Sequence, residues 1–149
     1  MTLQLALGSL ILVVSIMLAG IGFWLLESLL LRVRPWLIRP PHRPKLIALI
    51  CAAAVGALGI VTLSVWIWAL TFYELELFSS LEVSVYFALV TFTTLGFGDL
   101  LLRPDWRLLG GMAAVNGLMN IGLLTALMIE AGRYVRTIQR ETEREKNQT

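Results

Sequence analysis

The sequence has little charge, one cysteine and one histidine. Only 15% of its 149 residues are Asp, Glu, Lys or Arg, whereas soluble domains usually carry about 25%. The single cysteine, Cys51, excludes a disulfide within the chain and a cysteine cluster for a metal. The lone histidine, His42, leaves no Cys/His or Ser/His pair for nucleophilic catalysis. These absences exclude a disulfide-rich module and a nucleic-acid binder, and they argue against an enzyme.

Long apolar runs take the place of the missing charge, since 58% of the residues are hydrophobic. Three runs cover residues 3–26, 46–73 and 108–129. Each exceeds the roughly 20 residues that a helix needs to cross about 30 Å of hydrocarbon. The first run is too long for a cleaved signal peptide, and no basic residue precedes it. The sequence therefore predicts an all-α membrane protein with three transmembrane helices per chain.

Basic residues are concentrated in two stretches. Ten of the twelve Lys and Arg residues lie in residues 32–45 or 133–146. Because cytoplasmic loops are enriched in Lys and Arg, we expect both stretches to be cytoplasmic and the N-terminus to lie outside a plasma membrane. Four of the five prolines lie in residues 32–45, which predicts an extended linker rather than a helix. Anionic lipid headgroups are the expected partners of Arg32–Lys45 and Arg133–Lys146.

The segment between the second and third runs is too apolar for a solvated loop. It begins Ser79-Ser80-Leu81-Glu82, in which Ser79 and Glu82 have the spacing of a capping box. A helix over residues 80–93 is about 20 Å long at 1.5 Å per residue, which is too short to span the membrane. We therefore expect a re-entrant helix that enters from the outside and stops near the membrane centre.

The sequence that follows this half-length helix is Thr94-Leu95-Gly96-Phe97-Gly98, followed by Asp99. A bland interpretation is a glycine-containing turn that returns to the surface. Glycine also tolerates φ values that other residues resist, so alternate glycines allow successive carbonyls to turn to one side. Four such strands around one axis form rings of oxygens suited to a dehydrated monovalent cation. One chain supplies one strand, so this second interpretation requires a homotetramer.

At these residues the sequence resembles the pore-loop potassium channels, with an outer helix, a pore helix, a filter and an inner helix over roughly residues 50–135. The resemblance implies that Thr94, Leu95, Gly96, Phe97 and Gly98 are the selectivity filter and bind K⁺. It implies support of the filter by Tyr86, Phe87 and Asp99, including a hydrogen bond from the Tyr86 hydroxyl to Asp99. Phe97 departs from the commoner tyrosine, and Tyr86 and Phe87 stand where relatives often carry two tryptophans. The resemblance does not cover the first transmembrane helix, which is therefore an addition to the two-helix channel unit.

The third run contains candidates for gating. The resemblance places Gly117 near the hinge glycine of the inner helix, where a bend opens the inner mouth. Asn120 either lines the water-filled cavity or makes an interhelical hydrogen bond. Glu130 either contributes to an acidic ring at the inner mouth or is a solvated charge at the helix end.

These expectations divide the chain into an added helix (1–31), a basic linker (32–45), a pore domain (46–132) and a charged tail (133–149). Within the pore domain we expect an outer helix at 46–73, a pore helix at 80–93, the filter at 94–98 and an inner helix at 106–132. The predicted function is passive, potassium-selective conduction with K⁺ as permeant ion and no cofactor. A nonselective cation channel and a non-conducting membrane subunit are the alternatives.

Overall fold

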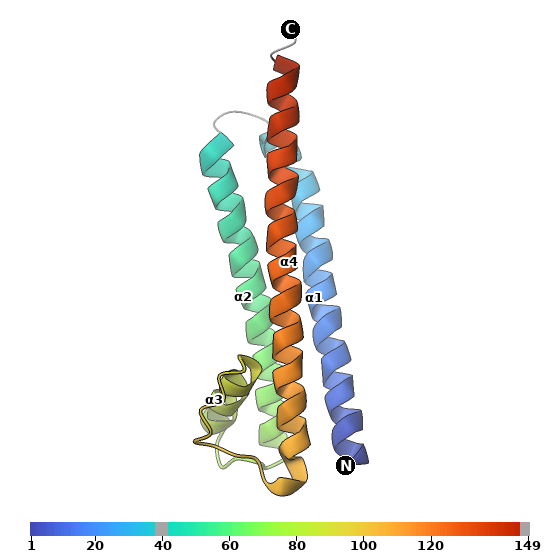
Figure 1. Cartoon of the computed structure of the whole chain (residues 1–149), viewed down its shortest axis with the longest axis vertical. Coiled ribbons are helices and arrows are strands. Elements are labelled where there is room, and N and C mark those ends of the chain that lie inside the picture. Colours follow the sequence, from blue (N-terminus) through green and yellow to red (C-terminus); the bar gives the residue numbers. More distant parts are fainter. Residues whose placement is uncertain (38–41, 147–149) are drawn as a thin grey trace.

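The computed structural model of the chain describes residues 1–37 and 42–146. Regular structure in these residues is helical, in the order α1 (Thr2–Leu37), α2 (His42–Glu74), α3 (Leu81–Phe92), the short 3₁₀ turn η1 (Pro104–Trp106) and α4 (Arg107–Lys146). The three long helices run side by side, and α3 lies beside one end of α2 and α4 (Figure 1). The N-terminus lies at the end that carries α3, and the C-terminal end of α4 lies at the opposite end.

Three helices in the described part of the chain are long and apolar enough to cross a membrane. The qualifying segments are Thr2–Val33, Ile47–Glu74 and Pro104–Glu130. Their Leu-, Ile- and Ala-rich sequences favour a helix, which is also the structure that satisfies its own backbone groups in lipid. The 12 residues of α3 extend only about 18 Å at 1.5 Å per residue. The prediction of three long helices and one half-length helix is confirmed.

The best-packed part of the core lies at the α3 end of the bundle. Phe72 of α2 and Phe92 of α3 are completely buried there, as is Leu109 of α4. The Phe72 ring meets the Phe87 ring edge-on, with centroids 5.3 Å apart and planes at 78°. Edge-to-face pairs add to the free energy of burial, so α3 is fixed against both α2 and α4.

The start of α3 differs by one residue from the prediction. The N-cap is Ser80, not Ser79, because Ser80 has the extended backbone that an N-cap requires (φ −145°, ψ 156°). Its Oγ accepts a hydrogen bond from the backbone N–H of Val83 at 3.3 Å. Glu82 lies in the first turn, where its negative charge is stabilised by the helix dipole.

The prediction of an extended linker over residues 32–45 was wrong for most of its length. Helix α1 continues to Leu37 and α2 already begins at His42. Pro44 lies in the first turn of α2, where a missing N–H removes no helical hydrogen bond. Pro35 lies in the last turn of α1, so little of the helix follows it. Arg39, Pro40 and Pro41 lie outside the described residues.

Helix α4 continues past the predicted end of the inner helix at residue 132. It contains 40 residues and is therefore about 60 Å long, twice the thickness of the hydrocarbon core. The predicted charged tail is thus continuous with the membrane-spanning part as far as Lys146, and residues 147–149 lie outside the described chain. Glu130 is exposed within this helix rather than at its end.

Candidate functional site

The C-terminus of α3 leads directly into the glycine-containing segment, and hydrogen bonds fix the junction. The backbone N–H groups of Leu95 and Gly96 both donate to the Val90 carbonyl, at 3.0 and 3.2 Å. The Thr93 hydroxyl donates to the Leu89 carbonyl at 2.8 Å. Carbonyls at a helix end lack intrahelical partners. Here residues of the following segment satisfy them, so the segment starts from a defined position.

Alternate residues of this segment have left-handed backbones. The φ angles of Thr94, Gly96 and Gly98 are 58°, 54° and 78°, whereas Leu95 and Phe97 between them do not have positive φ. This region of φ costs a non-glycine residue roughly 1–2 kcal/mol. A Cβ at Gly96 or Gly98 would meet nothing within 4 Å. The two glycines are therefore required by backbone conformation and not by close neighbours in the chain.

The side chains of the segment are not covered by their own chain. Leu95 is 58% exposed and Phe97 is 67% exposed, and the other residues from Thr93 to Asp99 are exposed as well. Apolar side chains of this size, next to a polar backbone, are typical of a surface that another molecule covers.

Asp99 connects the far end of the segment back to α3. The Tyr86 hydroxyl donates to Asp99 Oδ2 at 2.7 Å, which is the bond that the sequence predicts. The hydrogen bond to Asp99 is the main cause of a raised pKa for Tyr86, with smaller contributions from burial and from the negative charge of Asp99. The phenol therefore holds its proton more tightly than an ordinary tyrosine does, which preserves the donor of this bond.

Phe87 follows Tyr86 in α3, and its side chain is turned about 100° away from that of Tyr86. It is 9% exposed, and its ring lies 4.9 Å from Phe78 and 5.3 Å from Phe72, measured between centroids. Within the described residues, the aromatic rings that pair with Phe87 are those of Phe72 and Phe78, and Phe97 is not one of them. The structure therefore brings Tyr86 and Asp99 together, whereas Phe87 anchors α3 in the core and does not meet Phe97 within the chain.

Gly117 lets α4 contact the C-terminus of α3 backbone to backbone. A Cβ at this position would overlap the Phe92 carbonyl oxygen and lie 2.5 Å from its carbonyl carbon. At Gly111 and Gly122 of the same helix a Cβ would meet nothing within 4 Å. Close packing thus explains Gly117, and it does not explain the other two glycines.

A buried hydrogen-bonded cluster joins α1 to α4 beside Gly117. The Asn116 amide donates to Ser15 Oγ at 2.9 Å, and the Asn120 amide donates to Asn116 Oδ1 at 2.8 Å. All three side chains are at most 1% exposed. The burial of Asn120 disfavours the cavity alternative, but its own hydrogen bonds stay within α4, and the interhelical bond is made by Asn116. Ser15 was missed in the sequence, where its signal is a lone hydroxyl within an apolar run.

A different face of α4 is uncovered on the C-terminal side of Gly117. Leu118 is 64% exposed and Ile121 is 42% exposed, and Thr125 is also exposed. At 3.6 residues per turn these three positions lie within about 100° of Gly117 on the helix surface, on the side away from Asn116 and Asn120. The apolar run is continuous, so it carries no signal for this face.

Comparison with known proteins identifies the class. The chain matches the ion channel family over residues 60–134, which is half of its length. This chain belongs to the ion channel family. The match supports the resemblance to pore-loop potassium channels, and it places the chain in a non-enzymatic class. With three long apolar helices, this ion channel is a multi-pass membrane protein.

A curated relative supports the same class. The channel is 40% identical over 53 residues to the potassium voltage-gated channel protein shk-1 of Caenorhabditis elegans. The aligned part is 35% of this chain and 10% of the worm protein, so the chain spans a small fraction of that relative. No solved structure matches the channel.

Proposed function

We propose that the chain forms a potassium-selective channel in which Thr94, Leu95, Gly96, Phe97 and Gly98 of four copies make the selectivity filter. The observation that carries this proposal is the alternation of left-handed backbone at Thr94, Gly96 and Gly98. Reversing the hand at every second residue lets the carbonyls between them turn to one side. A stack of such carbonyls replaces the hydration shell of K⁺.

The surroundings of the segment support the same function. Helix α3 directs its C-terminal end, which carries partial negative charge, toward the start of the segment. The Tyr86–Asp99 hydrogen bond holds the far end of the segment against α3. Two anchors, one at each end, restrain a backbone that has few contacts of its own.

A homotetramer completes the site. The exposed Leu95 and Phe97 side chains lie beside the proposed carbonyl stack and are left uncovered by their own chain. In a ring of four copies, each chain covers the apolar side of its neighbour's segment. The same ring places the exposed face of Leu118, Ile121 and Thr125 toward a central cavity, in place of Asn120.

Gly117 and Glu130 are the proposed parts of the gate. Gly117 is where α4 contacts the C-terminal end of α3 backbone to backbone, and glycine is a common site of helix bending. Glu130 is exposed near the end of the apolar part of α4. Four copies at the inner mouth would attract cations.

The proposed orientation follows the basic residues. Arg32 lies near the C-terminal end of α1 and Lys45 lies in the first turn of α2, and these helix ends are remote from α3 (Figure 1). Arg133 and Arg136 lie toward the C-terminal end of α4, on the same side. Positively charged ends face the cytoplasm. The N-terminus and α3 are therefore proposed to face outward from a plasma membrane.

Rubidium uptake tests the proposed filter. Full-length protein in lipid vesicles should take up labelled Rb⁺, a K⁺ substitute, and excess K⁺ should compete whereas excess Na⁺ should not. Gly96→Ala should abolish uptake, because alanine resists the φ of 54° at this position. Gly111→Ala is the matched control, since its Cβ meets nothing within 4 Å. Equal competition by Na⁺, or uptake that survives Gly96→Ala, would contradict the proposal.

A further inference from the structure

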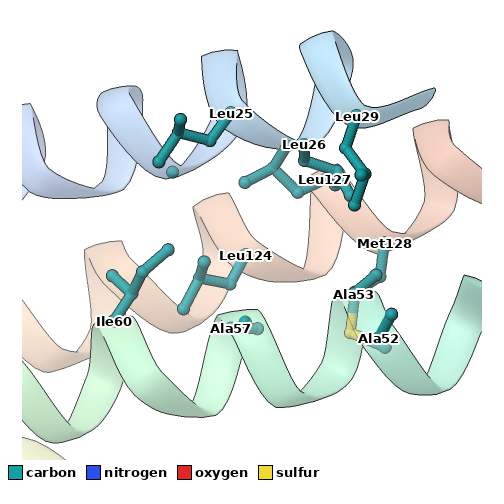
Figure 2. Close-up of a pocket in the computed structure, with 12 residues that line it drawn as sticks. Leu25, Leu26, Leu29, Ala52, Ala53, Ala57, Ile60, Leu124, Leu127 and Met128 are labelled. Carbon is teal, nitrogen blue, oxygen red and sulfur yellow. The ribbon is translucent and has the colours of Figure 1, made fainter. Parts of the chain in front are cut away.

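An apolar cavity of about 270 Å³ lies between α1, α2 and α4, in the half of the bundle remote from α3. Figure 2 shows leucines of α1 and α4 facing alanines of α2 across it. The lining includes Leu26 and Leu29 from α1, Ala53 and Ala57 from α2, and Leu124 and Leu127 from α4. The space arises because α2 presents small side chains where the other two helices present leucines.

The cavity is at hydrocarbon depth. Its lining residues fall within the three apolar spans of α1, α2 and α4. Two of them, Leu25 and Met128, are 55% and 37% exposed, so the cavity opens to the side of the bundle. Apolar cavities do not hold water, and atoms that line a void lose dispersion contacts. An apolar occupant therefore stabilises this part of the structure.

Basic residues lie just beyond the cavity, toward the end of the bundle remote from α3. Arg32 is three residues past Leu29 and Arg133 is five residues past Met128, which corresponds to roughly 5 and 8 Å along the helices. Arg32 and Arg133 are both exposed, as is Arg136 one turn further on. Glu27 and Glu130 are the exposed acids of this region. Basic side chains at the level of the lipid headgroups favour binding of a negatively charged lipid.

We propose that the cavity binds one acyl chain of an anionic phospholipid, with the phosphate near Arg32 and Arg133. The lining on α2 runs from Ala52 to Ile60, which gives about 12 Å of depth along the helix axis. This site depends on α1, which lies outside the matched region at residues 60–134. The proposal goes beyond conduction and rests on the cavity, the membrane spans and the arginines beside it, so it can fail or hold independently of the filter.

Photolabelling of the full-length protein in vesicles tests the site. The probe is phosphatidylglycerol with a diazirine on one acyl chain, diluted in phosphatidylcholine, and the comparison probe is phosphatidylcholine with the same labelled chain. We expect the anionic probe to label the cavity residues of α1, α2 and α4 in preference to other lipid-facing positions. Exposed Val13 of α1 is an internal reference for general contact with lipid.

One variant tests the cavity, another tests its basic rim, and a third is a control for the first. Ala57→Phe fills the cavity and should remove the preferential labelling, whereas Val55→Phe, at a 70% exposed position outside the lining, should leave it unchanged. Arg133→Gln leaves the cavity intact and should lower the preference for the anionic probe by about fivefold, the factor for one basic residue at a membrane surface. Labelling no stronger in the cavity than at Val13 would overturn the proposal. So would crosslinks from a neighbouring chain into the cavity, which would make that chain the occupant.

Discussion

Substitution of Gly117 by alanine is the sharpest test of how α4 packs on α3. The new Cβ would lie 2.5 Å from the carbonyl carbon and 2.9 Å from the Cα of Phe92, and it would overlap the carbonyl oxygen. These neighbours are backbone atoms, so no flexible side chain can move aside and the two helices must separate. Overpacking of this kind costs about 1–3 kcal/mol, whereas alanine in a helix gains about 0.5–1 kcal/mol over glycine.

The expected net loss for Gly117→Ala is therefore about 0–2.5 kcal/mol in the free energy of unfolding, which is about 1–3 kcal/mol below an alanine that meets no neighbour. Gly111→Ala and Gly122→Ala are matched controls on the same helix, because a Cβ at either site meets nothing within 4 Å. They should be neutral or more stable than the parent. Equilibrium unfolding in mixed micelles, followed by tryptophan fluorescence, measures all three variants. A Gly117→Ala variant as stable as the two controls would refute the packing argument.

Two further predictions concern hydrogen bonds. Ser15→Ala removes the acceptor of the Asn116 amide. It should lower the free energy of unfolding by about 0.6–1.7 kcal/mol, the range measured for hydrogen bonds between membrane helices. A loss near zero in the same unfolding assay would count against the cluster. The pKa of Tyr86 is raised in the folded protein, so its bond to Asp99 should contribute fully below pH 10 and be lost as pH rises through the raised value. A titration of stability should show this alkaline loss in the parent and not in Tyr86→Phe, and identical alkaline profiles would contradict the assignment.

The three spans and the half-length helix could be predicted from sequence because their signals are local and strong. Uninterrupted apolar runs of this length have few alternatives to a membrane helix. Serine followed by an acidic first turn located the start of α3 to within one residue. The choice between Ser79 and Ser80 depended on backbone conformation at two adjacent identical residues, which sequence does not distinguish.

The remaining differences came from tertiary context. A run that is apolar on all sides carries no period, so it does not reveal how α4 is rotated about its own axis. For that reason the sequence leaves the direction of Asn120 open, whereas the packing of α1 on α4, with Ser15 bonded to Asn116, determines it. The prolines predict a break between the helices, yet Pro44 lies in a first turn, where proline is tolerated.

The reversal potential tests the central claim of K⁺-selective conduction most directly. Purified full-length protein is placed in a planar bilayer with potassium chloride on one side and sodium chloride on the other. A filter built from residues 94–98 predicts a reversal potential close to the potassium equilibrium potential. A clear current that reverses near zero would show a nonselective pore and contradict the account.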